Sequence, residues 1–290
     1  MSASAHEETV VHHDIGESPE GENRPMARPA SPAANAGVAT RRIIFLVLLA
    51  IALVLPAFVK NFVVFQFTQT MVYAIAIVGL NLLTGFNGQF SLGHSAFYAV
   101  GAYTAAIMME HMGVNYVFTL PVAGAICFVL GFLFGLPALR LEGVYLALAT
   151  FALAAATPQI LKLSPLEHWT GGVQGIVITK PDAPFGLPLN QDQWLYYFTL
   201  IVGVILYICA KNLVTSRTGR ALMAIRDNPI AARSMGVNTS LYKASAFGLS
   251  ALYTGIAGAL GAIIVQFVAP DSFTLTLSIG FLVGLVVGGV

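Results

Sequence analysis

The stretch that decides the fold is Val117-Phe-Thr-Leu-Pro-Val-Ala-Gly-Ala-Ile-Cys-Phe-Val-Leu-Gly-Phe-Leu-Phe-Gly-Leu-Pro-Ala-Leu139, which carries no charged side chain. At about 1.5 Å per residue, a helix of this length reaches about 35 Å, enough to cross the hydrocarbon core of a bilayer. An earlier apolar segment, Ile43–Val59, follows Arg41-Arg42 and gives about 26 Å of helix. Because it begins so late in the chain, we do not expect it to be the core of a cleaved signal peptide. Both segments predict membrane-spanning helices.

The composition of the whole chain agrees with membrane insertion. Of the 290 residues, 57% are hydrophobic and only 9% are charged, and the mean hydropathy is +0.79. A soluble domain has about 25% charged residues, so this chain lacks the charges that would cover a surface in water. The net charge of +1 argues against bulk attraction to nucleic acid. Cys127 and Cys209 lie in apolar runs and form neither a disulfide framework nor a zinc site.

Eight apolar runs predict an all-α, polytopic bundle of about eight membrane spans. After Ile43–Val59, they cover residues 62–84, 95–109, 117–139, 143–163, 194–210, 244–268 and 272–290. An alternating path puts eleven Lys and Arg on the side of the N-terminus, and only Lys60, Lys162 and Lys180 on the other. Cytoplasmic loops are the ones rich in Lys and Arg, so the N-terminus is predicted to be cytoplasmic. The last run stops inside apolar sequence, and we expect the natural chain to continue.

Residues 1–40 differ in composition from everything that follows. They hold six acidic residues and two arginines among Ala, Ser and Pro. With no helical or strand period, they predict a disordered acidic cytoplasmic tail, followed by a transmembrane domain over residues 41–290. The spacing of His6, His12 and His13 fixes no metal geometry, so no metal site is expected there.

The stretch Asn81–Phe97 interrupts a helical pattern with three glycines and several polar side chains. Unpaired backbone cannot face hydrocarbon, because each unsatisfied amide costs several kcal/mol. The stretch therefore either packs inside protein along a solute pathway, as interrupted helices of transporters do, or forms a plain cytoplasmic turn, which the residues favour slightly. The candidates for a polar pathway lining are Asn81, Gln89, Ser91, His94 and Ser95.

The segment 211–243 is strongly basic, with six Lys and Arg against Asp227 alone. It predicts two short helices, at Thr218–Ile225 and Ile230–Met235. The residues that begin and end the second helix are Asn228 as N-cap, Pro229 at the first helical position and Gly236 as a left-handed C-terminal cap. The apolar side chains of both helices need a surface to cover them. A membrane interface and a cytoplasmic docking partner satisfy that need equally well.

The predicted outside loop 164–192 contains Trp169-Thr-Gly-Gly-Val-Gln-Gly175, a flexible backbone beside an aromatic side chain. A solvated loop is the simpler interpretation. Contact with a delivery protein, or a cap over the pathway, is the alternative.

Small residues recur at every fourth position in the run 244–268. This spacing lets helices approach closely, so the face is predicted to pack against another helix, either in this chain or in another subunit. The packing residues are Ala251, Gly255, Gly258 and Ala259.

Motifs for catalysis and nucleotide binding are missing from the sequence. None of the five lysines follows a glycine, so the chain has no P-loop. The nearest approach to a nucleophile elbow, Gly93-His-Ser-Ala-Phe97, lacks the final glycine, and Ser95 has no histidine base in another predicted span. Carboxylates are missing from the cores of the predicted spans, which disfavours a proton-coupled carrier. We expect no catalytic residue, no metal and no bound cofactor, and therefore no enzyme.

Several motifs resemble those of branched-chain amino acid ABC importer permeases of the LivM type. They are Gly79–Tyr103, Ser216–Asn238, Thr170–Gly175 and Gln266–Phe273, and the likeness covers about residues 70–290 in order. In this family the cytoplasmic loop docks on an ATPase subunit, so the resemblance favours docking for segment 211–243. The coupling residues that it implies are Gly219, Arg220, Ala221, Ile225, Arg226, Asp227, Pro229, Arg233 and Gly236.

The resemblance also implies an assembly in the bacterial inner membrane. Its other members would be a second homologous permease subunit, two cytoplasmic ATPase subunits that hydrolyse ATP, and an extracytoplasmic solute-binding protein. The cargo would be a branched-chain or related amino acid, moved by alternating access. Urea importer permeases share these motifs, so urea is an alternative cargo, and an autonomous secondary transporter is the alternative class. Family chains continue past a pair such as Gly288-Gly289 into a further span.

Overall fold

The computed structural model describes residue 47 and residues 49–56, 58–139, 141, 143–184 and 189–289. The predicted acidic tail over residues 1–40 lies outside these ranges. The contacts divide the chain into two units, Met1–Ile51 and Ala52–Val290. In the first unit, the described residues, 47 and 49–51, are helical.

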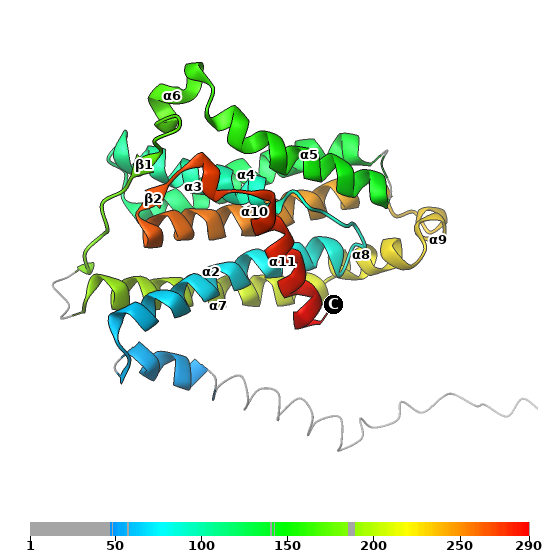
Figure 1. Ribbon diagram of the computed structural model, residues 1–290. Helices are drawn as coiled ribbons and strands as arrows, with labels where there is room; N and C mark the ends of the chain where they lie inside the picture. Colours follow the sequence, from blue (N-terminus) through cyan, green and yellow to red (C-terminus); the bar gives the residue numbers. More distant parts are fainter. Residues whose placement is uncertain are drawn as a thin grey trace, which may run out of the picture. The chain divides into compact units, whose positions relative to one another are not determined.

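The second unit is a bundle of long helices that run alongside one another, with two very short strands at one end (Figure 1). Its helices are α2 (Asn61–Thr84), α3 (His94–Glu110), α4 (Tyr116–Ala138), α5 (Val144–Leu161), α6 (Ser164–Thr170), α7 (Gln191–Thr215), α8 (Arg217–Asp227), α9 (Pro229–Ser234), α10 (Thr239–Val265) and α11 (Leu275–Gly288). The strands β1 (Ile176–Val177) and β2 (Phe267–Val268) pair antiparallel, and the short 3-10 helix η2 (Pro270–Ser272) precedes α11.

Six segments of the described chain are long and apolar enough to cross a membrane. They are α2, α4, α5, α7, α10 and the segment 270–288 that ends in α11. The 17 residues of α3 make a shorter helix, which packs against α10 and α4. The fold is therefore a multi-pass helical membrane protein, and the number of eight spans stays a prediction.

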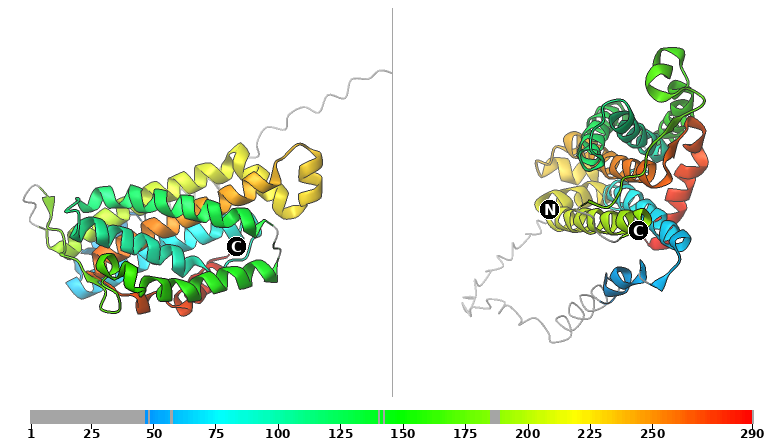
Figure 2. Two further views of the ribbon diagram at one scale, coloured as in Figure 1. Left: turned by 90° about the horizontal axis from the view of Figure 1, so that it is seen from above. Right: turned by 90° about the vertical axis from the view of Figure 1, so that its left-hand side faces the viewer.

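Helix α10 lies at the centre of the bundle and packs against α2, α3 and α4 (Figure 2). In the most apolar part of α10, 78% of the residues are buried inside the protein. In the corresponding part of α7, only 11% are buried. Small residues permit this burial: a Cβ on Gly101 of α3 would overlap the carbonyl oxygen of Gly255. A Cβ on Gly258 would likewise overlap the carbonyl oxygen of Tyr98. The small-residue face of α10 thus lies against helices of the same chain.

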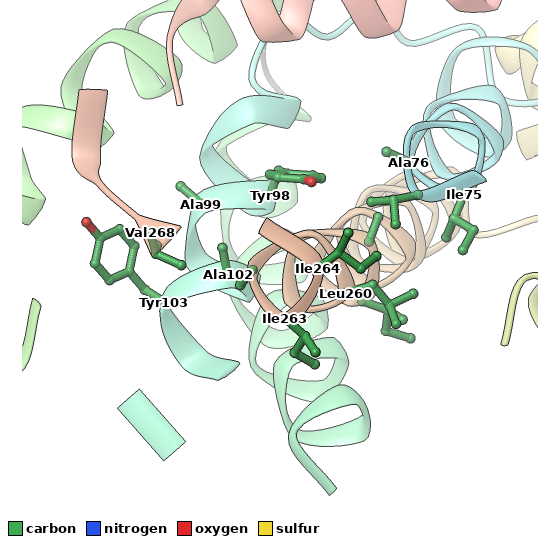
Figure 3. Packing of buried hydrophobic residues seen from close by; sticks show 14 of the residues in the cluster. Ile75, Ala76, Tyr98, Ala99, Ala102, Tyr103, Leu260, Ile263, Ile264 and Val268 are labelled. Carbon is green, nitrogen blue, oxygen red and sulfur yellow. The ribbon is translucent and has the colours of Figure 1, made fainter. Parts of the chain in front are cut away.

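Apolar side chains fill the space between α10 and its neighbours α2 and α3. Figure 3 shows this packing, in which branched side chains of α10 approach small and aromatic side chains of the other two helices. The residues are Leu260, Ile263 and Ile264 on α10, Ile75 and Ala76 on α2, and Tyr98, Ala99 and Ala102 on α3. Their burial supplies the dispersion contacts that hold helices together where lipid removes the hydrophobic driving force.

The connections between helices gather at two opposite ends of the bundle, as an alternating path requires (Figure 1). At one end, which we call the α8–α9 end, residues 85–93 and the turn at 141 and 143 meet α8 and α9. At the other, the strand end, β1 pairs with β2, and Lys162 Nζ lies 2.5 Å from Asp271 Oδ1. That the α8–α9 end is cytoplasmic, together with the N-terminus, remains a prediction.

Candidate functional site

The stretch that follows α2 is packed inside the protein. Asn87, Gln89 and Ser91 are 3%, 8% and 1% exposed. The Asn87 amide donates to Gln89 Oε1 at 2.8 Å, and Thr84 Oγ1 donates to the carbonyl oxygen of Gln89 at 3.0 Å. Leu92 N donates to Thr150 Oγ1 of α5 at 2.9 Å. The polar side chains of this stretch thus bond within the protein, and both the solute pathway and the plain cytoplasmic turn stay predictions.

A network of hydroxyl and imidazole groups surrounds the first turn of α3. His94 Nδ1 lies 3.1 Å from Ser91 Oγ, and His94 Nε2 lies 2.7 Å from Ser250 Oγ of α10. Ser278 of α11 donates to Ser95 Oγ at 2.8 Å and accepts a bond from the Ser95 amide at 2.8 Å. All five side chains are at most 1% exposed. We call Ser91, His94, Ser95, Ser250 and Ser278 the serine–histidine network, and it ties the start of α3 to α10 and α11.

The five predicted pathway residues do not all meet in one place. Ser91, His94 and Ser95 belong to the network, and Gln89 lies just before it with its amide paired to Asn87. Asn81 lies apart on α2, where its Oδ1 packs against Gly85. Whether any of these residues contacts a solute stays a prediction.

Two members of the network escaped prediction from the sequence. Ser250 and Ser278 come from positions 156 and 183 residues away from their partners His94 and Ser95. Ser250 stands in the small-residue region of α10, and that pattern predicts close packing without naming a hydrogen-bond partner.

A cavity of about 200 Å³ lies on the strand-end side of the network, which we call the strand-end cavity. Rings of Tyr73, Tyr98 and Phe273 line it, and Tyr98 is one helical turn from Ser95. Gln69 also lines it, and Gln69 Oε1 is buried with no hydrogen-bond partner among the described residues. Such mostly apolar cavities with a few polar groups are typical binding sites for small molecules. In the sequence, this cavity could have been indicated by Gln69 and Tyr73, which lie four residues apart in an apolar run and so on one face of a helix.

The two helices expected in segment 211–243 are present, and their caps explain their bounds. Helix α8 is longer than predicted, because Ser216 accepts a bond from the Gly219 amide at 3.5 Å and begins the helix earlier. Asn228 Oδ1 accepts bonds from the amides of Ile230 and Ala231, at 3.1 and 3.0 Å. Gly236 has a φ of 84°, the left-handed conformation that was predicted for it.

The apolar side chains of these helices divide between two surroundings. Leu222 and Ile225 of α8 are 3% and 2% exposed, so this chain itself covers them and they need neither membrane nor partner. On α9 and just after it, Ile230 and Met235 are 80% and 85% exposed. The surface that still needs a cover is therefore on α9.

Arg226 joins α8 to the stretch that follows α2. Its Nη1 donates to the carbonyl oxygen of Gly85 at 2.6 Å, and its Nε lies 3.4 Å from Asp227 Oδ1. Its aliphatic stem covers Gly88, whose φ is 72°, and a Cβ at Gly88 would lie 2.8 Å from Arg226 Cγ. Arg226 therefore links α8 directly to residues 85–88, close to the serine–histidine network.

Other predicted coupling residues serve local structure. Arg220 Nη1 donates to the carbonyl oxygen of Thr215 at 3.2 Å, and Arg233 Nε donates to Thr239 Oγ1 at 2.7 Å. Gly219 packs against the carbonyl group of Val214. These contacts fix α8 and α9 relative to α7 and α10.

The predicted outside loop is held in place where the structure describes it. Gly171 ends α6 with a φ of 69°, and Gly175, with a φ of 75°, packs against the carbonyl oxygen of Val268 beside the β1–β2 pair. Lys180 and Asp192 form an ion pair. The glycines thus serve a defined backbone path, and more than half of the described residues of this loop are exposed, as in a solvated loop. Contact with a delivery protein stays a prediction.

Known proteins resemble this chain over most of its described length. Residues 62–290 match the family model for the permease component of the branched-chain amino acid transport system. The chain is 34% identical over 281 residues to the high-affinity branched-chain amino acid transport system permease protein LivM of Salmonella typhimurium (strain LT2), covering 89% of this chain and 66% of the relative. LivM of Escherichia coli (strain K12) gives the same identity and coverage.

A permease of another import system is also similar to this chain. The autoinducer 2 import system permease protein LsrC of Escherichia coli (strain K12 / DH10B) is 28% identical over 257 residues, which cover 86% of this chain and 72% of the relative. No solved structure matches the chain. The chain spans 66% of the length of the LivM relatives. Because the family model covers most of a multi-pass helical fold, the chain belongs to the family of permease components of branched-chain amino acid transport systems.

Proposed function

We propose that the chain is the permease subunit of an ABC importer for branched-chain or related amino acids in the bacterial inner membrane. The observation that carries the proposal, beyond family membership, is the order of features along one segment. Residues 87–89 lie at the α8–α9 end, the serine–histidine network follows at residues 91–95, and Tyr98 and Ala102 line the strand-end cavity. A buried polar network beside a cavity supports a pathway that works by alternating access.

The strand-end cavity suits a neutral amino acid with an aliphatic side chain. No charged side chain is among the described residues that line it, and aromatic rings provide an apolar wall. The unpaired Gln69 Oε1 can accept a hydrogen bond from an α-ammonium group. Urea would leave the apolar wall without a partner. The higher identity to the LivM proteins than to LsrC also favours amino acids.

Coupling to ATP is assigned to α8 and α9. In the proposed assembly, two ATPase subunits hydrolyse ATP and contact the exposed side chains Ile230 and Met235. The bond from Arg226 to Gly85 then passes the movement of α8 to the start of α3, where the serine–histidine network opens and closes. The chain itself binds no cofactor. A second permease subunit and an extracytoplasmic solute-binding protein complete the importer.

The test is copurification of the tagged, full-length protein from its native membrane, followed by reconstitution. Mass spectrometry should identify an ATPase and a second permease, and proteoliposomes of the complex should take up labelled L-leucine only with ATP. Replacement Gln69→Leu should raise the KM for leucine about tenfold, the value of one lost hydrogen bond to a charged group. Gln66→Leu, at an exposed position of the same helix, is the matched control. A chain that purifies alone and moves leucine without ATP would establish a secondary transporter instead.

A further inference from the structure

A second cavity, of about 190 Å³, lies at the α8–α9 end of the bundle, and we call it the α8–α9 cavity. Six parts of the chain line it: the stretch after α2, the turn between α4 and α5, the first turn of α5, helix α8, the start of α9 and the start of α10. Polar groups make up most of its lining, and Leu141, Leu146, Ile225 and Pro229 contribute the smaller, apolar part. The function proposed above uses Arg226 and residues 87–89 of this lining for coupling but assigns no ligand to the cavity.

Asn87 gives the cavity a hydrogen-bond acceptor that lacks a donor. The side chain lines the cavity and is only 3% exposed. Its Nδ2 donates to Gln89 Oε1 at 2.8 Å, which fixes the amide orientation, while its Oδ1 has no partner among the described residues. A buried acceptor without a donor destabilises the protein, so a ligand that donates a hydrogen bond here gains binding free energy.

Two cationic side chains line the same cavity, Arg226 and Lys243. Arg226 uses Nη1 for the carbonyl oxygen of Gly85, and its Nε lies near the Asp227 carboxylate. A guanidinium has five N–H donors, so Arg226 retains donors for a ligand. The cavity therefore combines cationic donors, one unpaired acceptor and an aliphatic wall.

We propose that the α8–α9 cavity binds a zwitterionic branched-chain amino acid on the side of the membrane where cargo is released. The α-carboxylate lies at Arg226 and Lys243, the α-ammonium donates to Asn87 Oδ1, and the aliphatic side chain packs against Leu146 and Ile225. The choice of this amino acid class rests on the proposed function.

Occupancy of this cavity has a consequence for transport. Ile225, Arg226 and Pro229 belong to α8 and α9, whereas Asn87 belongs to the stretch that leads to α3. A ligand that bonds to both sides holds them together and opposes the movement that couples ATP hydrolysis to import. The cavity therefore acts as a product-sensing site, through which accumulated cargo slows its own uptake.

The first test is binding of radiolabelled L-leucine to the purified complex without ATP, measured by equilibrium dialysis. Asn87→Leu, which removes the acceptor at similar volume, and Lys243→Gln should each weaken one class of leucine site at least about tenfold. The matched controls are Asn212→Leu and Lys211→Gln, exposed positions of α7 outside the cavity. The affected class should differ from the one that Gln69→Leu weakens. Leucine binding that is unchanged in both cavity variants would overturn the inference.

The second test uses proteoliposomes loaded with ATP. Unlabelled L-leucine inside the vesicles should slow the initial uptake of labelled leucine by the unmodified complex. Each variant is compared with its own uptake rate without internal leucine: Asn87→Leu and Lys243→Gln should lose this inhibition, whereas the α7 controls should keep it. Inhibition of equal size in all variants contradicts the inference. If uptake is absent but leucine binding depends on Asn87, the site stands and the proposed importer function fails.

Discussion

Replacement Gly88→Ala tests the link between α8 and the stretch that follows α2. The φ of 72° at Gly88 is a left-handed conformation, in which an alanine costs about 1 kcal/mol. The new Cβ would also lie 2.8 Å from Arg226 Cγ, so the arginine must move and lose its 2.6 Å bond to Gly85. A hydrogen bond from a charged donor contributes about 1.5–3 kcal/mol. Arg226 is 44% exposed, so the lower value applies and the expected total is about 2.5 kcal/mol.

A double-mutant cycle separates the two costs. In an Arg226→Ala background, Gly88→Ala should destabilise by only about 1 kcal/mol, which leaves a coupling energy of about 1.5 kcal/mol. The assay is reversible unfolding of the purified protein in detergent, read by circular dichroism. Gly113→Ala is the matched control, because Gly113 has a φ of 61° with nothing within 4 Å of its would-be Cβ. If Gly88→Ala and Gly113→Ala cost the same, or the cycle is additive, Arg226 does not hold this stretch.

The remaining predictions concern helix packing, the serine–histidine network and coupling. Gly101→Leu should prevent folding, because its side chain would overlap the backbone of α10. Gly280→Ala should leave folding unchanged, because a Cβ there would lie in open space. Monodispersity of the purified protein in detergent distinguishes the two outcomes. Ser278→Ala should destabilise the protein by about 1–3 kcal/mol, because it leaves the buried Ser95 amide unpaired. Ser95→Ala should destabilise it by less, because the bond from the Ser95 amide to Ser278 survives. Equal losses of unfolding free energy in the two variants would contradict this network. Gly236→Pro is incompatible with a φ of 84° and removes the amide that bonds Arg233. It should lower leucine uptake about tenfold while membrane insertion and ATP hydrolysis by the assembled complex persist, and normal uptake would refute a coupling role for α9.

Local signals in the sequence predicted the helices and their caps well. The run 117–139 became α4, because an uncharged segment of that length has few other stable conformations in lipid. Asn228 and Gly236 marked the ends of α9, because capping depends on backbone groups within a few residues. The small residues around Gly255 predicted a close helix contact for a similarly local reason.

The composition of the candidate site depended on contacts that sequence patterns do not encode. His94 and Ser95 were predicted as candidate site residues, but their partners Ser250 and Ser278 were not. These two serines lie on helices whose apolar residues show no periodic pattern that would indicate which face of each helix points toward α3. The same limit applied to α8, where Leu222 was expected to need a membrane or a partner. Burial by the chain's own α10 and α2 followed from the tertiary arrangement alone.

The central position of α10 has a consequence for biosynthesis. His94 and Ser250 are 156 residues apart, so at about 5–20 residues per second the ribosome needs roughly 8–30 seconds to make the second after the first. Helices α3 and α4 are synthesised during that interval while α10 is still missing, so we expect the site that α10 will occupy to stay open and His94 to wait for Ser250. Nascent chains paused before Thr239 should therefore expose this site to the insertion machinery, and crosslinks from it to α3 should disappear once α10 has been synthesised and inserted.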